Sequence, residues 1–465
     1  MENVKDLNHK PLSVKQYAIV SSLLFGLFFG AGNLIFPVHL GQLSGAHWVV
    51  AMLGFLCTAV ALPLLSVLAI SVTRSKGVYD IGRPLGPAFA LGFMILIHAT
   101  IGPLFGTPRT ATVSFTVGVQ PLLPKNAVHL GLLVFSGLFF LAAFLCSYKQ
   151  SNIMTSIGKL LNPLFLVLLF ATFLLGFLSP MGHAASQTVT SAYVNGSFFN
   201  GFLQGYNTMD ALSGLAFGVT VVTAVNEMGK TNPISNSKVT AKAGVFAVGT
   251  IGLIYVGLVW LGATSLGKFN VSPDGGVAFN QIMNYYLGGV GHAFLATLLT
   301  LACITTAIGL VGAFAQDFHK HFPKVSYKVW LGLMCLASFL TANFGLDQII
   351  AWSTPMLMFL YPFAMVLILL SVTSPLFHRD PVVYAWTVVC TAVPAFLEMI
   401  SSFPPVVSQS GFGKAVTTFQ SNYLPFASAG MDWVVPALVG AILGVTFHLV
   451  LKAKRNGAVE SEKED

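Results

Sequence analysis

The stretch that decides the fold is FFGAGNLIFP, residues 28–37. It lies in the middle of an apolar run that is long enough to cross a bilayer, yet two glycines and a proline interrupt it. A helix that breaks at membrane depth frees N–H and C=O groups that lipid cannot satisfy, so a break is tolerated where it faces a cavity, an ion or a substrate. The stretch therefore predicts a broken transmembrane helix beside a binding site.

A second interrupted stretch, GYNTMDALSG at residues 205–214, supports the same interpretation. It falls in the sixth apolar run of the chain, whereas the first stretch falls in the first run. Breaks in spans one and six imply two five-span units, and because five is odd, the second unit enters the membrane from the opposite face. Interrupted segments at matching positions of two such halves indicate a transporter binding site. The alternative is that these glycines only allow close helix packing, but that leaves Pro37 and Asp210 unexplained.

The composition indicates a membrane protein. Of the 465 residues, 55% are hydrophobic and only 8% are charged, whereas soluble domains carry about 25% charged residues. So few charges cannot cover a water-facing surface of this size, so most of the exterior must face lipid. The predicted fold class is an all-α integral membrane protein of about 12 transmembrane helices, with a 5+5 inverted repeat, broken spans 1 and 6, and two peripheral C-terminal spans.

Apolar runs long enough for a bilayer, about 20 residues each, place the predicted spans at 16–41, 48–73, 88–119, 128–146, 152–178, 201–225, 239–263, 291–318, 327–343, 346–372, 383–400 and 433–451. The first run is too long for a signal peptide, so we expect it to be retained. The predicted organisation is a cytoplasmic segment 1–15, a first repeat 16–180, a second repeat 181–373, peripheral spans 374–451 and a charged tail 452–465.

The basic residues predict the orientation, because Lys and Arg concentrate on the cytoplasmic side of membrane proteins. With the N-terminus inside, 19 of the 23 Lys and Arg residues fall in inner segments. The predicted outer loops hold only Lys125, Lys268 and Lys414, and Arg109 lies within a span. Both termini are therefore expected in the cytoplasm of a bacterial cell with the chain in its inner membrane. The same split explains the net charge of +8 without a nucleic-acid partner.

Three of the charged residues within predicted spans, Asp210, Arg109 and Glu398, carry open alternatives. A carboxylate such as Asp210 at a span centre costs about 2.5–3.5 kcal/mol on insertion scales, so such residues are usually functional. Asp210 could hold a cation, attract a substrate ammonium group, or form an ion pair with Arg109. Arg109 could be a gate, a contact to a substrate carboxylate, or the partner in that pair. Glu398 could be linked to protons, although snorkelling to the surface is the simpler account.

Several other classes of chemistry have no support in the sequence. It contains no phosphate-binding GxxxxGK[ST] loop, no GxSxG and no HExxH. All five cysteines lie in apolar runs without a CxxC pair, which argues against disulfides and a zinc site. We therefore predict that the chain is not an enzyme and has no organic cofactor. Its oligomeric state is not indicated.

Five separated motifs together resemble a known family. They are FFGAGNLIFP at 28–37, GPL at 102–104, PRTA at 108–111, TMDA at 208–211 and ITTA at 304–307. The chain resembles the bacterial branched-chain amino acid carrier II family, BrnQ-type symporters that couple leucine, isoleucine or valine to sodium. That family is similar to the LeuT-like transporters with two inverted five-span repeats. The resemblance implies a LeuT-like fold, branched-chain amino acids as substrates and Na+ as the coupling ion.

The resemblance also implies roles for individual residues. The expected ion ligands are Gly26, Phe28, Phe29, Asn33, Thr208, Thr305 and Thr306. For the substrate, the resemblance places Asn33 beside the carboxylate. The helix breaks, the charge within the sixth span and nearby apolar side chains, rather than the resemblance, predict the other substrate contacts: Ala31, Gly32, Leu34, Phe105, Met209, Asp210, Ser213 and Ile304. Two other functions stay open on the same fold: a proton-coupled or exchanging amino acid carrier and, less well supported, a channel.

Overall fold

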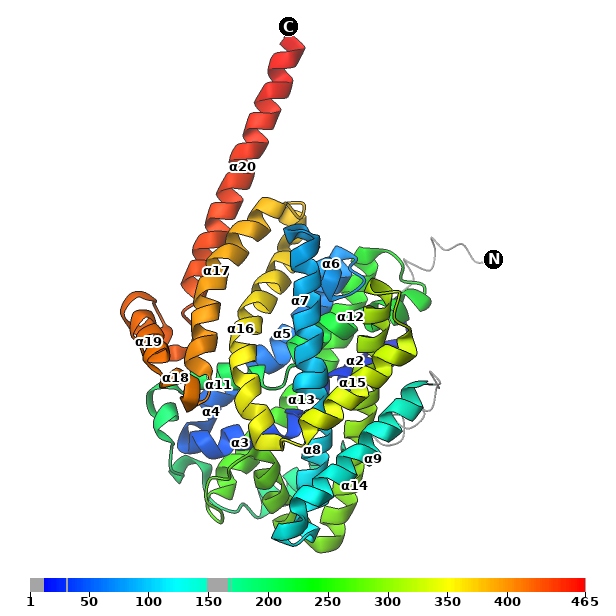
Figure 1. Ribbon diagram of the computed structural model, residues 1–465, viewed down its shortest axis with the longest axis vertical. Helices are drawn as coiled ribbons and strands as arrows, with labels where there is room; N and C mark the ends of the chain where they lie inside the picture. The colour runs from blue at the N-terminus through cyan, green and yellow to red at the C-terminus, as the bar shows by residue number, and fades with distance from the viewer. Residues whose placement is uncertain (1–11, 31, 149–165, 168, 465) are drawn as a thin grey trace.

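A computed structural model of the chain describes residues 12–30, 32–148, 166–167 and 169–464. Among these residues the only regular structure is helical, with no β-strand (Figure 1). Most of the fifth predicted span, 152–178, lies outside the described residues, and its end coincides with the apolar helix Leu169–Leu178. The all-α prediction is confirmed.

The helices of the first half follow the predicted spans. The first span is α2 (Val14–Phe28) and α3 (Gly32–Ser44), and the second is α4 (Trp48–Leu56), the π-helical turn η2 (Cys57–Ala61) and α5 (Leu62–Thr73). After the short α6 (Val78–Gly82), the third span consists of α7 (Pro87–Ala99), the kinked η4 (Thr100–Leu104) and α8 (Gly106–Gly118), and α9 (Val128–Tyr148) follows. The kink in the third span lies at Gly102, next to Pro103, where a proline removes a helical hydrogen bond.

The second half begins with α11 (Ser191–Tyr206) and α12 (Asp210–Glu227), the two parts of the sixth span. The helices after them are α13 (Pro233–Ser265), α14 (Gly275–His321), α15 (Tyr327–Ala342), α16 (Leu346–Thr373), α17 (Pro381–Ser402), α18 (Pro405–Ser408), α19 (Gly411–Tyr423) and α20 (Val434–Glu464). Three bounds differ from the prediction by ten residues or more: α11 begins at 191 rather than 201, α14 begins at 275 rather than 291, and α20 continues past 451 into the charged tail. Within α14, Gly288 has non-helical φ and ψ, so the part of the helix after this kink begins close to the predicted bound.

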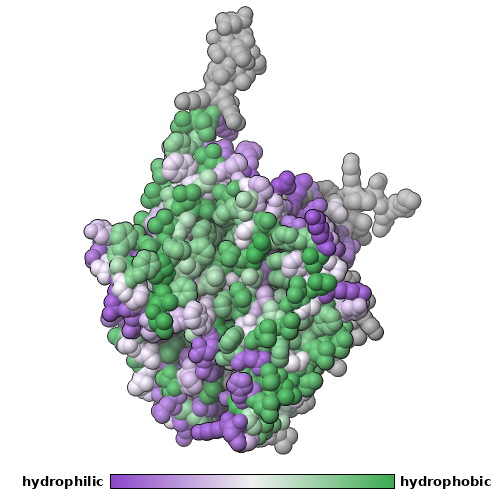
Figure 2. All heavy atoms as spheres, in the orientation of Figure 1, coloured by the Kyte–Doolittle hydropathy of each residue, from purple (hydrophilic) through white to green (hydrophobic). Residues whose placement is uncertain are grey.

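The described helices are long and apolar enough for a multi-pass membrane protein. Eight of them meet the length and hydropathy of a span, and nine do so if the bent pair Ser191–Gly218 and Thr220–Glu227 is one span. The apolar helices Leu169–Leu178 and Tyr327–Ala342 are shorter. Figure 2 shows apolar side chains over much of one face, with hydrophilic ones gathered toward the upper right and the lower edge. The count of about 12 spans remains a prediction.

Both predicted helix breaks are present. The first lies between Phe28, the end of α2, and Gly32, the start of α3. The second separates Tyr206 from Asp210, and within it Met209 has φ 59°. A left-handed backbone is uncommon for a residue with a side chain, so this conformation is held in place by its surroundings. The prediction of broken spans 1 and 6 is confirmed.

The two broken spans pack in a reciprocal pattern. Helix α3 packs on α13, and α11 packs on α4, while the other halves, α2 and α12, pack on α13 and α5 respectively. Since α4 and α5 belong to the second span and α13 is the seventh, each broken span packs on the helix that follows the other one. An inverted repeat would produce this exchange. Helix α17 packs on α20 on one side and on α16 on the other, so it connects α20 to the rest of the molecule (Figure 1).

Paired glycines bring the main chains together at two of these interfaces. A Cβ added to Gly41 of α3 would lie 2.0 Å from the Val259 carbonyl oxygen of α13, and one added to Gly262 would lie 2.0 Å from the Val38 carbonyl oxygen. At the α4–α11 interface, a Cβ added to Gly54 would lie 1.9 Å from the Phe198 carbonyl oxygen, and one added to Gly201 would lie 1.9 Å from the Ala51 carbonyl oxygen. No larger residue fits at these four positions without separating the helices.

Candidate functional site

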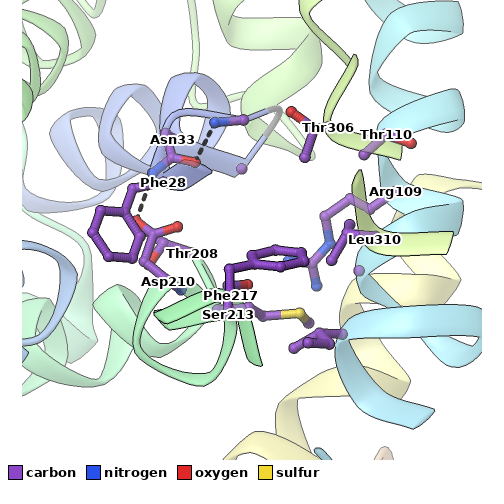
Figure 3. A pocket seen from close by; sticks show the side chains of 15 residues that line it. Phe28, Asn33, Arg109, Thr110, Thr208, Asp210, Ser213, Phe217, Thr306 and Leu310 are labelled. Atoms are coloured by element: carbon purple, nitrogen blue, oxygen red, sulfur yellow. Dashed lines mark hydrogen bonds between the residues drawn. The ribbon is translucent and has the colours of Figure 1, made fainter. Parts of the chain in front are cut away.

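The candidate site is a cavity between the two helix breaks and the helices α8 and α14. The space amounts to about 480 Å³, including the part that opens to solvent. Polar side chains of α3, α8, α12 and α14 surround it (Figure 3). The lining residues are Phe28, Gly30, Gly32, Asn33, Ile101, Gly106, Arg109, Thr110, Thr208, Met209, Asp210, Ser213, Phe217, Thr306 and Leu310.

Asn33 ties the two breaks together. Its side chain is 2% exposed, and its Oδ1 accepts the Gly30 N–H at 2.9 Å, which closes the turn of the first break. Its Nδ2 donates to Asp210 Oδ2 at 2.6 Å across 177 positions of sequence and also to the Tyr255 hydroxyl of α13 (Figure 3). One amide therefore fixes the first break, the second break and the seventh span relative to one another.

Asp210 begins α12 at the second break, and its side chain is only 4% exposed. Its Oδ2 accepts from Asn33 and from the Tyr255 hydroxyl, the latter at 3.2 Å. A carboxylate is favoured at a helix N-terminus because the helix dipole is positive there. Within the described part of the chain, no basic side chain forms a salt bridge with Asp210. The predicted alternative of an ion pair with Arg109 is therefore wrong for this structure.

Arg109 lies on α8 and is 3% exposed. Its guanidinium donates to the Asn207 carbonyl at 2.6 Å and to Ser353 Oγ of α16 at 2.8 Å, and it stacks over the Phe36 ring at 4.9 Å. Its Nε is buried and has no hydrogen-bond partner among the residues described. The arginine thus joins α8 to the second break, to α3 and to α16, and it leaves one donor unused.

The residues expected to bind the ion only partly meet at the cavity. Phe28, Asn33, Thr208 and Thr306 line it, whereas Gly26, Phe29 and Thr305 do not. The hydroxyls of Thr305 and Thr306 both donate to the Ala302 carbonyl, at 2.8 and 3.1 Å. α2 ends at Phe28, and the Gly30 N–H, which would be the helical partner of the Gly26 carbonyl, is donated to Asn33 Oδ1 instead. Carbonyl and hydroxyl oxygens therefore gather where α2 ends and α14 passes.

The expected substrate contacts divide in the same way. Gly32, Asn33, Met209, Asp210 and Ser213 line the cavity. Leu34, Phe105 and Ile304 do not, and Ala31 lies outside the described residues.

Helix geometry explains these three corrections. Consecutive residues on an α-helix point about 100° apart, so Leu34 faces away from the direction of Asn33, and Ile304, two positions before Thr306, faces away from it. Phe105 instead lines a neighbouring groove with Phe344 and Trp352, because the kink of η4 turns it aside.

The sequence analysis did not identify several residues of the site. Ile101, Phe217 and Leu310 form apolar parts of the cavity wall, and Tyr255 supports Asp210 from α13. Phe217 and Leu310 had a detectable signal: they lie seven positions after Asp210 and four after Thr306, spacings that return to the same helix face. Tyr255 had no such signal, because only the packing of α13 on the first span brings it to the site.

Comparison with known proteins was made on this whole chain. A family described as "Branched-chain amino acid transport protein" matches residues 13–451. The chain belongs to this family. Relatives in the branched-chain amino acid transport family include the permease BrnQ of Lactobacillus delbrueckii subsp. lactis, which is 40% identical and covers 92% of this chain and 95% of its own length. The permease BraB of Bacillus subtilis is 38% identical, with coverage of 95% and 97%. BrnQ of Escherichia coli K12 is 33% identical, with coverage of 91% and 93%.

Solved structures confirm the fold predicted for this member of the family. Inward-facing Mhp1 is similar with a TM-score of 0.62 at 12% identity, covering 94% of this chain and 91% of that one. MhsT in complex with L-phenylalanine is similar with a TM-score of 0.50 at 16% identity, covering 94% and 98%. At such identities the likeness concerns the fold alone, which is LeuT-like. The resemblance inferred from the motifs is confirmed, and the homologues are named as permeases rather than enzymes.

Proposed function

We propose that the chain is a sodium-coupled symporter that imports leucine, isoleucine and valine by alternating access. One observation carries the proposal: Asp210 and Arg109 line the same cavity, both are buried, and no salt bridge joins them. A buried charge without a partner costs several kcal/mol. A zwitterion in the cavity brings a cation for the carboxylate and an anion for the guanidinium, so it compensates both.

The ammonium group of the substrate is assigned to Asp210. The carboxylate already accepts two hydrogen bonds on Oδ2, from Asn33 and Tyr255, which hold it in place. Its other oxygen, Oδ1, remains available for an N–H of the ligand. Hydrogen bonds to charged groups contribute about 1.5–3 kcal/mol, so this contact would be a principal source of affinity.

The carboxylate of the substrate is assigned to the first turn of α3 and to Arg109. The start of a helix presents free N–H groups and the positive end of the helix dipole, and half-helices in transporters direct such ends at anionic substrate groups. Gly32 leaves room for that approach, because it lines the cavity with only a hydrogen for a side chain. The unused Nε of Arg109 adds a charged donor on the opposite side.

The aliphatic side chain of the substrate is assigned to the apolar part of the wall. Phe28, Ile101, Phe217 and Leu310 supply it from four different elements. One methylene changes binding in an apolar pocket by only about 1–3 kcal/mol. A wall of this kind therefore accepts leucine, isoleucine and valine together, and it rejects polar side chains that would lose their hydrogen bonds to water.

The sodium ion is treated as a second substrate and is assigned to the oxygens where α2 ends. Hard cations prefer oxygen ligands, and the candidates are the carbonyls of Gly26, Phe28 and Phe29 with the hydroxyls of Thr305 and Thr306. The Ala302 carbonyl, which both hydroxyls contact, adds a further oxygen. One charge moving inward with the membrane potential contributes about 2.3 kcal/mol per 100 mV, which is enough to concentrate the amino acid.

The orientation follows from the basic residues, since Lys and Arg favour the cytoplasmic side. With both termini in the cytoplasm of a bacterial cell, the two broken spans and their partners would rock against the remaining helices and expose the cavity to either side in turn. The proposed location of the chain is the inner membrane of that cell.

The test is uptake of labelled leucine by proteoliposomes that contain the full-length chain, with a sodium gradient or with potassium in its place. Accumulation is expected with sodium only. Equal accumulation in potassium would rule out sodium coupling, and if it then required an acid outside, the proton-coupled carrier would be favoured. Counterflow without any gradient-driven accumulation would indicate an exchanger, and ionic current far above the leucine flux would indicate a channel.

A further inference from the structure

A second buried polar site lies away from the cavity, where α17, α19 and the start of α20 meet (Figure 1). Gln420 Nε2 donates to Glu398 Oε2 at 3.0 Å and to Asp432 Oδ2 at 2.9 Å. The Ser401 hydroxyl donates to Gln420 Oε1, which fixes the amide so that its NH₂ end faces both carboxylates. Asp432 is fully buried. Glu398 is half-buried, and its Oε2 is held by the Gln420 amide.

No positive charge compensates these two carboxylates. The salt bridges among the described residues are His98–Asp317 and His448–Asp380, and both lie elsewhere. The titratable and charged side chains on the surrounding elements are Tyr193 and Tyr206 of α11, Asp347 and Tyr361 of α16, Asp380 at the N-cap of α17 with Tyr384 and Cys390 within it, Lys414 and Tyr423 of α19, and, on α20, His448, Lys452, Lys454, Arg455, Glu460, Glu462, Lys463 and Glu464. The nearest lysine along the chain, Lys414, is exposed. Two like charges that share one neutral amide repel each other and lose hydration, so at least one must be neutralised.

Unsatisfied buried groups also point into this site. The Tyr206 hydroxyl, the Trp433 indole N–H and Asp432 Oδ1 have no hydrogen-bond partner within the described ranges. Tyr206 is 1% and Trp433 7% exposed, and the Tyr206 hydroxyl faces both Trp433 and the Glu398 carboxylate. Buried polar groups are normally hydrogen-bonded. A proton on one carboxyl group would give the unpaired Asp432 oxygen a donor, and a water beside it would accept from the two N–H and O–H donors.

We propose that Glu398 and Asp432 form a proton-binding site in the C-terminal spans. The two carboxyl groups share one proton, which binds a carboxylate oxygen, and the Gln420 amide bridges the pair. The proton comes from water, and no other bond changes. Burial also raises the pKa of the Asp432 carboxyl, which favours proton binding at this site.

The site is connected to the broken helix. Tyr206 is the last residue of α11, next to the second break, and its ring stacks on Tyr361 of α16 with 4.1 Å between centroids and 8° between planes. Gly430, which precedes Asp432, packs against Leu203 of α11. Gain or loss of the proton therefore changes the charge beside a helix that must move during transport, so we expect the site to make transport sensitive to pH on the side it faces.

The direct test is infrared difference spectroscopy of the purified full-length protein, without sodium or leucine, between about pH 5 and about pH 9, well above the ordinary carboxyl pKa values of about 4. The Asp210→Asn background removes any signal from the central carboxyl. The expected result is a protonated carboxyl band that titrates in this range and disappears in Glu398→Gln and in Asp432→Asn. The matched control is Glu227→Gln, which changes an exposed carboxylate and should leave the band unchanged. Absence of the band from the parent, or its survival in both variants, overturns the proposal.

A charge-supplying variant tests the same idea without removing either carboxyl group. Gln420→Lys places a cation between the carboxylates, so the band should be lost although both groups remain. A band that persists in Gln420→Lys contradicts the proposal.

Leucine uptake tests the link to transport, and it depends on the proposed function whereas the spectra do not. At saturating sodium, uptake should vary with external pH in the wild type and lose this variation in Glu398→Gln. Equal variation in both overturns the link.

Discussion

Asp210→Asn tests the assignment of the substrate ammonium group most directly. Asparagine has nearly the same shape as aspartate, and its Oδ1 can still accept from Asn33 and Tyr255, which now bond Asp210 at 2.6 and 3.2 Å. The substitution therefore removes the charge while it keeps the connection between the two breaks. Loss of folding is not expected from this change.

The magnitude follows from the kind of hydrogen bond that is lost. Hydrogen bonds to charged groups contribute about 1.5–3 kcal/mol, and neutral ones about 1 kcal/mol. In the variant Oδ1 is occupied by Asn33 and Tyr255, so the asparagine turns its NH₂ group to the ammonium and no hydrogen bond replaces the charged one. Leucine binding should therefore weaken by about 1.5–3 kcal/mol, which is a factor of about 10–150 in affinity. The affinity for sodium should change less, because the oxygens assigned to sodium belong to α2 and α14.

The assay is equilibrium binding of labelled leucine to purified protein at saturating sodium, together with a sodium titration at saturating leucine. The matched control is Asp274→Asn, since Asp274 is also buried and caps α14 through the N–H groups of Gly276 and Val277, and asparagine caps helices equally well. If Asp210→Asn binds leucine within twofold of the wild type, Asp210 does not hold the ammonium group. If only sodium binding weakens, the carboxylate belongs to the ion.

Three further predictions test other parts of the structure. Arg109→Lys should lower leucine uptake about tenfold or more, because a lysine cannot form the two directed bonds of a guanidinium fork; uptake near the wild-type rate would contradict this. Thr306→Ala should raise the sodium concentration for half-maximal uptake more than Thr305→Ala, because only Thr306 lines the cavity, and the reverse order would move the ion toward Thr305. Gly41→Ala should destabilise the protein by about 1–3 kcal/mol, since its Cβ would lie 2.0 Å from a carbonyl oxygen, whereas Gly249→Ala, with nothing within 4 Å, should not lower the unfolding temperature in detergent.

The parts of the site that could be predicted from sequence are those with local signals. Asn33 lies in an interrupted apolar run, and Asp210 is a charge within another, so each marks a break by itself. The hydrogen bond between Asn33 and Asp210, across 177 positions, could not be predicted, because a contact at such a separation has no local signal in the sequence. The alternative of an ion pair between Asp210 and Arg109 rested on their charges alone. The pair does not form in this structure, because the guanidinium of Arg109 donates to a carbonyl of the second break and to Ser353.

Other features depended on information that a single sequence does not contain. A helical segment from Gly275 to the kink at Gly288, where φ is 61°, precedes the predicted span at 291. It was not predicted, because the polar residues between 280 and 284 interrupt its apolar pattern. The amphipathic α19 was not predicted, since it is too short and too polar to resemble a span. It supplies Gln420, so the carboxylate pair of the C-terminal spans could not be recognised from Glu398 alone.

The reciprocal glycines described for α3 with α13 and for α4 with α11 have a mechanical consequence. Where main chains touch, a shift along the interface drives carbonyl groups into each other, so these four helices resist sliding and behave as one solid piece. The distance between Asn33 of α3 and Tyr255 of α13 should then be the same whichever way the protein opens. What changes during a transport cycle would be the seam facing α8 and α14, where Arg109 and Thr306 stand.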